Sequence, residues 1–198
     1  MMRNEASTRS AGATLTRHVA LLRGINVGGN RKVPMAELRE LAAGLGWKEV
    51  ATYIQSGNLV FAAKGSAATL EGQLEEAIEG HFGFAVPVVV RSGARWLEYA
   101  GPSPLLAAET ERPNVLHLGL SKQPPKAGAV DALAKYCTAG EKIALRSDAL
   151  WIDFAGGVAR SKLTMAVLDR VIGSTVTLRN WKTVQELAKM VLEATREA

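Results

Sequence analysis

The stretch RGINVGGNRK, residues 23–32, lies between an apolar run and a segment with helical periodicity. It places three glycines, two asparagines and three cations within ten residues. Glycine allows a tightly bent backbone, and free backbone N–H groups beside cations favour an anion. The stretch therefore predicts a loop between a strand and a helix that faces a polar, negatively charged ligand.

Outward from this loop, residues 15–92 predict the order strand, helix, strand, strand, helix, strand. Pro34 suits the first position of one helix, Ser66 can cap the other, and QSGN at residues 55–58 suits a tight turn. The spacing of apolar residues places the helices at 34–45 and 67–82 and the strands at 17–22, 50–54, 59–62 and 86–90.

The same order of elements recurs in residues 113–198. Residues 93–112 contain Gly101, Pro102 and Pro104, with Pro113 directly after them, and are interpreted as a connector with a short helix at 96–99. The two predicted hairpins align without a gap, residues 54–59 over residues 145–150, which favours duplication. The second unit has expected strands at 114–120, 142–145, 150–154 and 175–178, and helices at 130–136, 163–172 and, added at the end, 184–192.

A βαββαβ unit with right-handed crossovers forms a ferredoxin-like sheet with two helices on one face. The predicted fold class is therefore α/β (α+β), with two ferredoxin-like βαββαβ units in tandem plus a C-terminal helix. The topology places the end of the first strand and the turn after the second strand at the same sheet edge. Residues 23–32 are thus expected beside residues 55–58.

The composition sets limits on the class of protein. The chain has 198 residues, 47% of them apolar, and a formal charge of +5 without a basic tail. The single cysteine, Cys137, precludes an internal disulfide and fits a reducing compartment. No apolar run approaches the ~20 residues of a membrane span. Residues 1–14 lack an apolar core and are predicted to be a mobile tail, and the protein is predicted to be cytoplasmic.

The candidate ligand-binding residues of the first unit are polar groups and glycines at one sheet edge. A nest of N–H groups around Gly28 and Gly29, with charge from Arg23, Arg31 or Lys32, would bind an anion. The alternative is that the glycines only shape the loop and the asparagines cap it. A nucleotide-hydrolysing P-loop is rejected, because Asn30 and Arg31 stand where Lys and Ser/Thr are required. The candidates are Arg23, Asn26, Gly28, Gly29, Asn30, Gln55, Ser56 and Asn58.

The second unit carries two polar stretches, RSKLT at residues 160–164 and TLRNWKT at residues 177–183. In the first, Ser161 stands where a helix N-cap belongs, with Lys162 beside it; in the second, Thr183 and Glu186 form a capping-box pattern. Cations in a first helical turn oppose the helix dipole, which a bound anion would offset. Trp181 could stack on a ring or serve as a partly buried staple. The candidates are Ser161, Lys162, Arg179, Asn180 and Trp181.

The sequence contains few candidate catalytic or metal-binding residues. His18, His81 and His117 are isolated and lack metal-ligand spacing, so no metal site is predicted. Cys137 has no basic neighbour in sequence and is interpreted as structural. The catalytic residues and any cofactor stay unknown at this stage, and the sequence leaves open whether the protein is an enzyme.

Four stretches also carry a family resemblance. ALLRGINVGGNRKVPMAELRELAAGLGW, VATYIQSGNLVF, RSKLT and TLRNWKTVQEL occur in order between residues 20 and 187, and the resemblance covers roughly residues 17 to 195. They resemble the signature stretches of bacterial proteins of the domain of unknown function 1697 family. The resemblance implies an α/β protein of ferredoxin-like repeats and implies no known reaction, substrate or cofactor.

Two hypotheses for function follow from these residues. The first is a polar, anion-favouring cleft that binds a small phosphorylated or otherwise anionic ligand. The alternative is a module that binds single-stranded RNA or DNA, since ferredoxin-like sheets often do so and the chain is basic. Under the first hypothesis the polar loops of both units are predicted to form one site, with Arg23 or Asn26 near Lys162 or Arg179.

Overall fold

The structure, a computed structural model, describes residues 14–193. The tail predicted for residues 1–14 therefore lies outside the described residues except for Thr14. The first unit consists of β1 (Thr16–Leu22), α1 (Met35–Gly44), β2 (Lys48–Tyr53), β3 (Asn58–Ala63), α2 (Ala67–Phe82) and β4 (Val88–Ser92). These elements follow the predicted order, and the Ser66 side chain caps α2 by accepting a hydrogen bond from the Thr69 N–H at 3.2 Å.

The second unit repeats this order. It consists of β5 (Leu116–Ser121), α5 (Ala129–Ala134), β6 (Lys142–Arg146), β7 (Ala149–Asp153), a short 3-10 helix η1 (Val158–Arg160), α6 (Met165–Ile172) and β8 (Val176–Asn180). The final helix, α7 (Trp181–Glu193), follows β8 directly. Between the units, the stretch interpreted as a connector forms two helices, α3 (Gly93–Tyr99) and α4 (Leu106–Glu111), instead of the one short helix expected.

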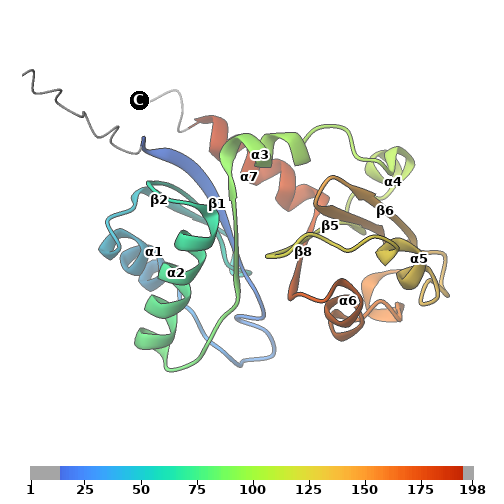
Figure 1. Cartoon of the computed structure of the whole chain (residues 1–198), viewed down its shortest axis with the longest axis horizontal. Helices are drawn as coiled ribbons and strands as arrows, with labels where there is room; N and C mark the ends of the chain where they lie inside the picture. Colours follow the sequence, from blue (N-terminus) through green and yellow to red (C-terminus); the bar gives the residue numbers. More distant parts are fainter. Residues whose placement is uncertain (1–13, 194–198) are drawn as a thin grey trace, which may run out of the picture.

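The two sheets have the same antiparallel topology, with strand orders β2-β3-β1-β4 and β6-β7-β5-β8. The register makes the units comparable residue by residue. Ala20 of β1 lies opposite Leu59, and Gly119 of β5 lies opposite Leu150. Leu59 and Leu150 are therefore equivalent, as the gapless alignment of the two hairpins predicted. The fold is the expected mixed α/β arrangement of tandem βαββαβ units with a C-terminal helix (Figure 1).

Alternating residues of each strand enter different cores, which follows from the two-residue period of a strand. One face of the first sheet packs against α1 and α2, where Phe61 stacks on Trp47 at 3.9 Å between ring centroids. One face of the second sheet packs against α5 and α6 around Ile152 and Phe154. These two cores contain only residues of their own unit.

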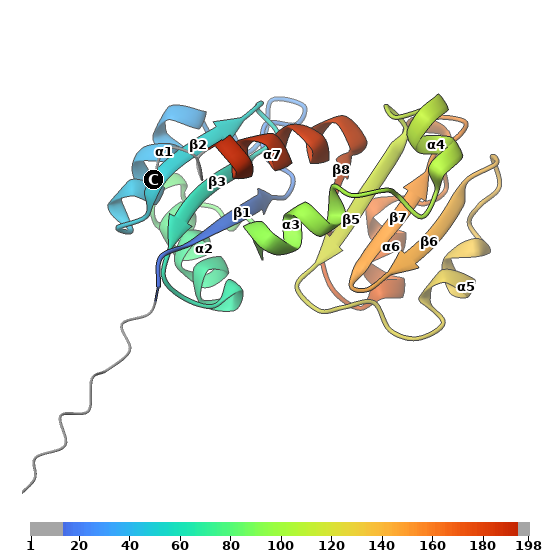
Figure 2. The same cartoon turned by 90° about the horizontal axis from the view of Figure 1, so that it is seen from above.

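The other faces of both sheets share one core. Val19 and Val60 of the first sheet and Leu118 of the second belong to the same buried cluster as residues of α3 and α7. Trp96 of α3 is fully buried there and donates its indole N–H to the Val184 carbonyl of α7 at 3.1 Å. Figure 2 shows α3 and α7 lying between the two sheets. The open face that a single ferredoxin-like sheet would present to solvent is therefore covered in each unit.

Two helices of the second unit are capped by other residues than predicted. Ser161 does not cap α6, because the helix begins at Met165 and the Thr164 side chain accepts the Val167 N–H instead. The capping-box prediction for the last helix was also wrong. This helix begins at Trp181, and the Asn180 side chain accepts the Thr183 N–H at 2.9 Å. In both cases a neighbouring residue with the same capping chemistry takes the position, which sequence alone does not distinguish.

Two histidines occupy equivalent positions, His18 in β1 and His117 in β5. His18 is 4% exposed and stacks on Phe61, and burial lowers the pKa of its imidazole below the ordinary value of 6.5. Burial likewise lowers the pKa of His117, which packs edge-on against Phe154. Burial therefore disfavours the protonated form of both rings in the folded state.

The neutral histidines predict a loss of stability in mild acid. Below pH 6.5 the unfolded chain takes up protons that the folded chain does not bind, so stability falls as the pH falls. Replacing His18 by phenylalanine should reduce this loss by up to about 1 kcal/mol between about pH 7.5 and about pH 5.5. Urea unfolding of the wild type and of the His18 variant at the two pH values measures the change in the free energy of unfolding. An equal loss in wild type and variant would contradict the prediction.

Candidate functional site

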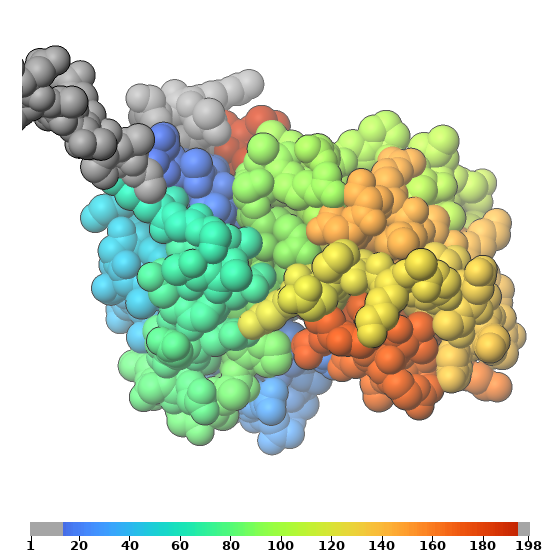
Figure 3. Space-filling model, in the orientation of Figure 1, coloured from blue at the N-terminus to red at the C-terminus, as the bar shows by residue number. Residues whose placement is uncertain are grey.

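The stretch 23–32 forms a small hairpin before α1. The Asn26 N–H donates to the Arg31 carbonyl at 3.1 Å, and the Asn30 N–H donates to the Val27 carbonyl at 3.1 Å. Gly28 and Gly29 form the turn with φ values of 59° and 79°, a left-handed conformation that glycine adopts without a Cβ penalty. The glycines thus have the local role expected for them, and the hairpin is exposed (Figure 3).

The Asn26 side chain fixes this hairpin to its surroundings. Its Nδ2 donates to the Gln55 carbonyl at 2.8 Å and to the Val33 carbonyl at 3.0 Å, and its Oδ1 accepts the Val33 N–H at 2.9 Å. Three hydrogen bonds from one amide thereby connect the loop after β1, the start of α1 and the turn after β2. The prediction that residues 23–32 lie beside residues 55–58 is confirmed by these contacts.

The turn at residues 55–58 packs closely against the end of β1. A Cβ placed on Gly57 would lie 2.7 Å from the Leu22 Cβ and from the Ile25 Cδ1. Asn58 is fully buried, and its Nδ2 donates to the Tyr53 carbonyl at 2.9 Å and to the Ser56 Oγ at 3.0 Å. Asn58 therefore shapes the turn from inside, whereas Gln55 and Ser56 are exposed.

A hollow of about 390 Å³ lies where these segments meet. Asn26, Gly29, Lys32, Val33, Pro34 and Gln55 line it. Its volume falls within the range of small-molecule sites. Three of these residues, Asn26, Gly29 and Gln55, are among the predicted ligand-binding residues. Lys32, Val33 and Pro34 were not in that set, although Lys32 ends the stretch from which it was drawn.

The start of α1 gives this hollow a positive character. Pro34 occupies the N-cap position, and no side chain caps the helix. The N–H groups of the first turn of a helix lack intrahelical acceptors and carry a partial positive charge. Arg31 and Lys32 are exposed, and within residues 14–193 neither forms an ion pair or a hydrogen bond through its side chain. Lys32 and an uncapped helix start therefore border the hollow, and Arg31 directly precedes Lys32 in the chain.

The cation of Arg23 lies elsewhere. Its Nη1 donates to the Asp169 carboxylate of α6 at 2.7 Å, so that Arg23 connects the two units. The second oxygen of Asp169 accepts the Val176 N–H at 2.8 Å. Because its charge is already paired, Arg23 contributes less to an anion site than its position in the sequence suggested.

Arg179 of β8 is buried in the junction of the units, with 8% of its surface exposed. Its guanidinium donates to the carbonyls of Leu22, Ser56 and Gly57 at 2.7, 3.0 and 3.1 Å and to the Asn58 Oδ1. Burial lowers the pKa of Arg179 to about 10. Its donors are used within the protein, so Arg179 is not placed to bind a ligand directly.

The other candidates of the second unit have structural partners or lie apart. Ser161 donates to the Glu141 carboxylate and accepts the Leu163 N–H at 3.1 Å. Trp181 is 6% exposed and packs against Trp151, with 5.5 Å between ring centroids, so its ring is not available to a ligand. Lys162 is exposed and has no ion pair among the described residues.

The polar loops of the two units, which were predicted to lie together, are therefore in contact only in part. Arg179 reaches the turn at residues 55–58, so the loop edge of the first unit does meet β8 of the second. Ser161 bonds within its own unit, and neither it nor Lys162 lines the hollow beside Asn26. The structure thus brings Arg179 to the first unit's loops as an internal contact, and the prediction of one shared ligand site is not tested.

A second hollow, of about 340 Å³, lies between the units. Glu75, Glu79 and Lys122 contribute its charged groups, and Lys122 pairs with the Glu75 carboxylate at 2.7 Å. The unpaired carboxylate of Glu79 disfavours an anion there. Among the described residues no group of three or more His, Cys, Asp or Glu side chains is arranged to hold a metal ion.

Sequence reasoning missed a polar cluster at the junction. Asp148, in the turn between β6 and β7, accepts hydrogen bonds from Arg91 at 3.1 Å, from Arg95 at 2.7 Å and from the Tyr99 hydroxyl at 2.7 Å. Burial alone would raise the pKa of Asp148, but the bonds from Arg95 and Tyr99 outweigh it and lower the pKa. One signal in the sequence could have indicated this cluster. Arg91 and Arg179 are equivalent, because each is the fourth residue of the last strand of its unit, β4 or β8.

Comparison with known proteins gives the family and the fold. The family model described as a protein of unknown function, DUF1697, matches residues 15–151, which excludes the stretches RSKLT and TLRNWKT. Among solved structures, a conserved bacterial protein from Streptococcus pneumoniae is similar at a TM-score of 0.65 and 24% identity, over 90% of this chain and 99% of that chain. No curated protein matches the chain. No described helix is long and apolar enough to cross a membrane. Because the family model covers more than half of its residues, this chain belongs to the DUF1697 family of proteins of unknown function.

Proposed function

We propose that the hollow at the start of α1 binds a small anionic ligand of the phosphate type. The observation that carries this proposal is the junction of an uncapped helix start with Lys32, whose side chain has no ion pair among the described residues, at a hollow of about 390 Å³. Oxyanions bind well at helix N-termini because the backbone N–H groups and the helix dipole both favour negative charge.

Further groups around the hollow support the same ligand class. The side chains of Asn26 and Gln55 line it, and Asn26 is held by three hydrogen bonds, so the wall is fixed before a ligand arrives. Preorganised walls reduce the entropic cost of binding. The acidic residue of the first turn, Glu37, bonds to His81 at 3.0 Å. Its carboxylate is therefore engaged by a side chain of α2.

The nucleic-acid alternative has less support. RNA-recognition modules of this topology stack bases on the open face of the sheet. In this chain α3 and α7 cover that face of both sheets, and Trp181 is buried against Trp151. We therefore favour the small ligand. No nucleophile with an adjacent base lines the hollow, so the proposal concerns binding and not a reaction. Because the chain has a single cysteine, the proposed compartment is the cytoplasm.

The proposal predicts a specific effect of anions on thermal stability. Phosphate at about 100 times its dissociation constant should stabilise the protein by about 2.7 kcal/mol, and more than chloride at equal ionic strength. Replacing Lys32 by alanine should weaken phosphate binding by about three- to tenfold, because one charge-assisted contact is lost. Thermal unfolding across a phosphate titration measures both effects.

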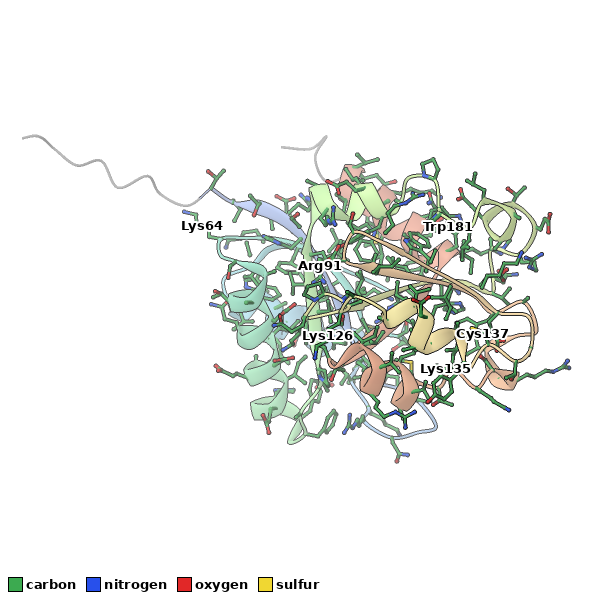
Figure 4. The ribbon with its side chains drawn as sticks, turned by 45° about the vertical axis from the view of Figure 1, so that its right-hand side comes forward. Lys64, Arg91, Lys126, Lys135, Cys137 and Trp181 are labelled. Atoms are coloured by element: carbon green, nitrogen blue, oxygen red, sulfur yellow. The ribbon has the colours of Figure 1, made fainter. Side chains whose placement is uncertain are left out.

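Lys64 provides a matched control for Lys32. It is also exposed and unpaired among the described residues, and Figure 4 labels it on the first unit. It lines a different hollow, with Trp47. Replacing Lys64 by alanine changes the net charge equally and should leave phosphate binding unchanged. The proposal is contradicted if phosphate and chloride act alike on the wild type, or if both variants weaken phosphate binding equally.

A further inference from the structure

Two equivalent arginines cross between the units in opposite directions. Arg91 lies opposite Val19 in β1, and Arg179 lies opposite Leu118 at the same position of β5. Arg91 reaches into the second unit, where its Nη2 donates to the carbonyl at the end of β5 at 2.7 Å. Arg179 reaches into the first unit, where its Nη2 donates to the carbonyl at the end of β1 at 2.7 Å. Figure 4 shows Arg91 in the middle of the molecule, between the units.

The two junctions differ in their charge. Arg91 meets the carboxylate of Asp148 in the turn after β6. The alignment of the hairpins places Gly57 at the position of Asp148, and Arg179 contacts the neutral amide of Asn58 there. Within residues 14–193 no Asp or Glu forms an ion pair with Arg179. One junction thus contains its counter-charge, and the other buries a cation among neutral acceptors.

The uncompensated cation lies next to the hollow at the start of α1. Arg179 bonds to the Ser56 carbonyl at 3.0 Å, and the adjacent carbonyl, that of Gln55, bonds to Asn26 at 2.8 Å. Gln55 and Asn26 both line the hollow. The ion pair of Arg23 with Asp169, which also connects the two units, is neutral as a whole. Only the backbone of Gln55 and Ser56 therefore separates an anion in the hollow from the positive charge of Arg179.

We propose that the anion bound in this hollow is the missing counter-charge of Arg179, and that Arg179 is a positioning residue that favours doubly charged anions, such as phosphate monoesters, over singly charged ones. This inference rests on the proposed function. Unit charges on the order of 10 Å apart in a partly buried setting change a binding constant by about tenfold, and the effect doubles in free energy for a dianion.

Three variants separate the charge of Arg179 from its hydrogen bonds. Arg179→Lys keeps the charge and loses most of the hydrogen bonds. Arg179→Gln loses both. Asn58→Asp keeps the arginine and places a carboxylate against it, as Asp148 does at the other junction. The matched control is Asp148→Asn, which removes a carboxylate from the junction that is not beside the hollow. Calorimetric titration with inorganic phosphate and with acetate near pH 8 gives the affinities, and thermal unfolding gives the stability of each variant.

The expected result is that phosphate affinity follows charge and not stability. Arg179→Lys should bind phosphate within about threefold of the wild type even if its melting temperature falls, whereas Arg179→Gln and Asn58→Asp should weaken binding by about tenfold or more. The preference for phosphate over acetate should fall in the same two variants. Asp148→Asn should leave both affinities unchanged. If Arg179→Gln does not fold, the other two variants still test the inference: Arg179→Lys should retain phosphate affinity, and Asn58→Asp should lose it.

Other outcomes overturn the inference in distinguishable ways. If Arg179→Lys binds phosphate as weakly as Arg179→Gln while Asn58→Asp binds like the wild type, Arg179 acts only through its hydrogen bonds. The inference is then wrong and the proposed function stands. If the wild type binds no phosphate, the proposed function fails, and the role of Arg179 fails with it.

Discussion

Replacing Trp96 by alanine is expected to lower the free energy of unfolding by about 3–5 kcal/mol. Trp96 is fully buried between the sheets, packs edge-on against Tyr99 and donates to the Val184 carbonyl of α7. The variant leaves a cavity at the core that both units share, and it removes the hydrogen bond that the indole donates to the Val184 carbonyl. Urea unfolding followed by fluorescence and by circular dichroism measures the effect.

The position of Trp96 also predicts how the protein unfolds. Because the cluster around Trp96 contains residues of both sheets and of α7, its loss should destabilise the two units together in one transition. Leu106→Ala is the control, since Leu106 is 61% exposed and its loss should change stability by less than about 0.5 kcal/mol. Two separate transitions, with only one of them shifted in the Trp96 variant, would show that the units do not depend on this core.

Replacing Gly57 by alanine is expected to destabilise the protein by about 2–4 kcal/mol. Gly57 has a φ of 74°, and an added Cβ would lie 2.7 Å from atoms of both Leu22 and Ile25. The neighbouring β1 is buried in the sheet and cannot withdraw. Since the Gly57 carbonyl also accepts bonds from the Leu22 N–H at 2.8 Å and from Arg179, the turn cannot move without breaking the junction.

Gly28→Ala is the control that distinguishes the cost of backbone strain from the cost of steric contact at Gly57. Its φ of 59° is also left-handed, but a Cβ there would meet nothing within 4 Å. Gly28→Ala should therefore cost only about 1 kcal/mol, the backbone contribution alone. Denaturant unfolding of the two variants gives the difference. Equal losses in the two variants would mean that the close approach of Gly57 to Leu22 and Ile25 has no energetic effect.

The sequence by itself determined the order of elements and the topology. Apolar periodicity, Pro34 and Ser66 located the first helices, and the repeated order in residues 113–198 predicted a second sheet of the same kind. Right-handed crossovers then placed residues 23–32 beside residues 55–58, which the hydrogen bonds of Asn26 confirm. These features depend on local spacing and chain connectivity, which are visible in a linear sequence.

The roles of the individual polar side chains were decided only by the tertiary structure. Arg23, Arg31 and Arg179 are alike in sequence, yet Arg23 pairs with Asp169, Arg31 is unpaired among the described residues, and Arg179 is buried among carbonyls. Trp181 is equally suited to stacking and to packing until α7 places it against Trp151. Which cation meets a carboxylate depends on how the two units pack, a long-range arrangement that no local pattern encodes. The hollow at the start of α1 is therefore bordered by a cation, Lys32, that this packing leaves without an ion pair among the described residues.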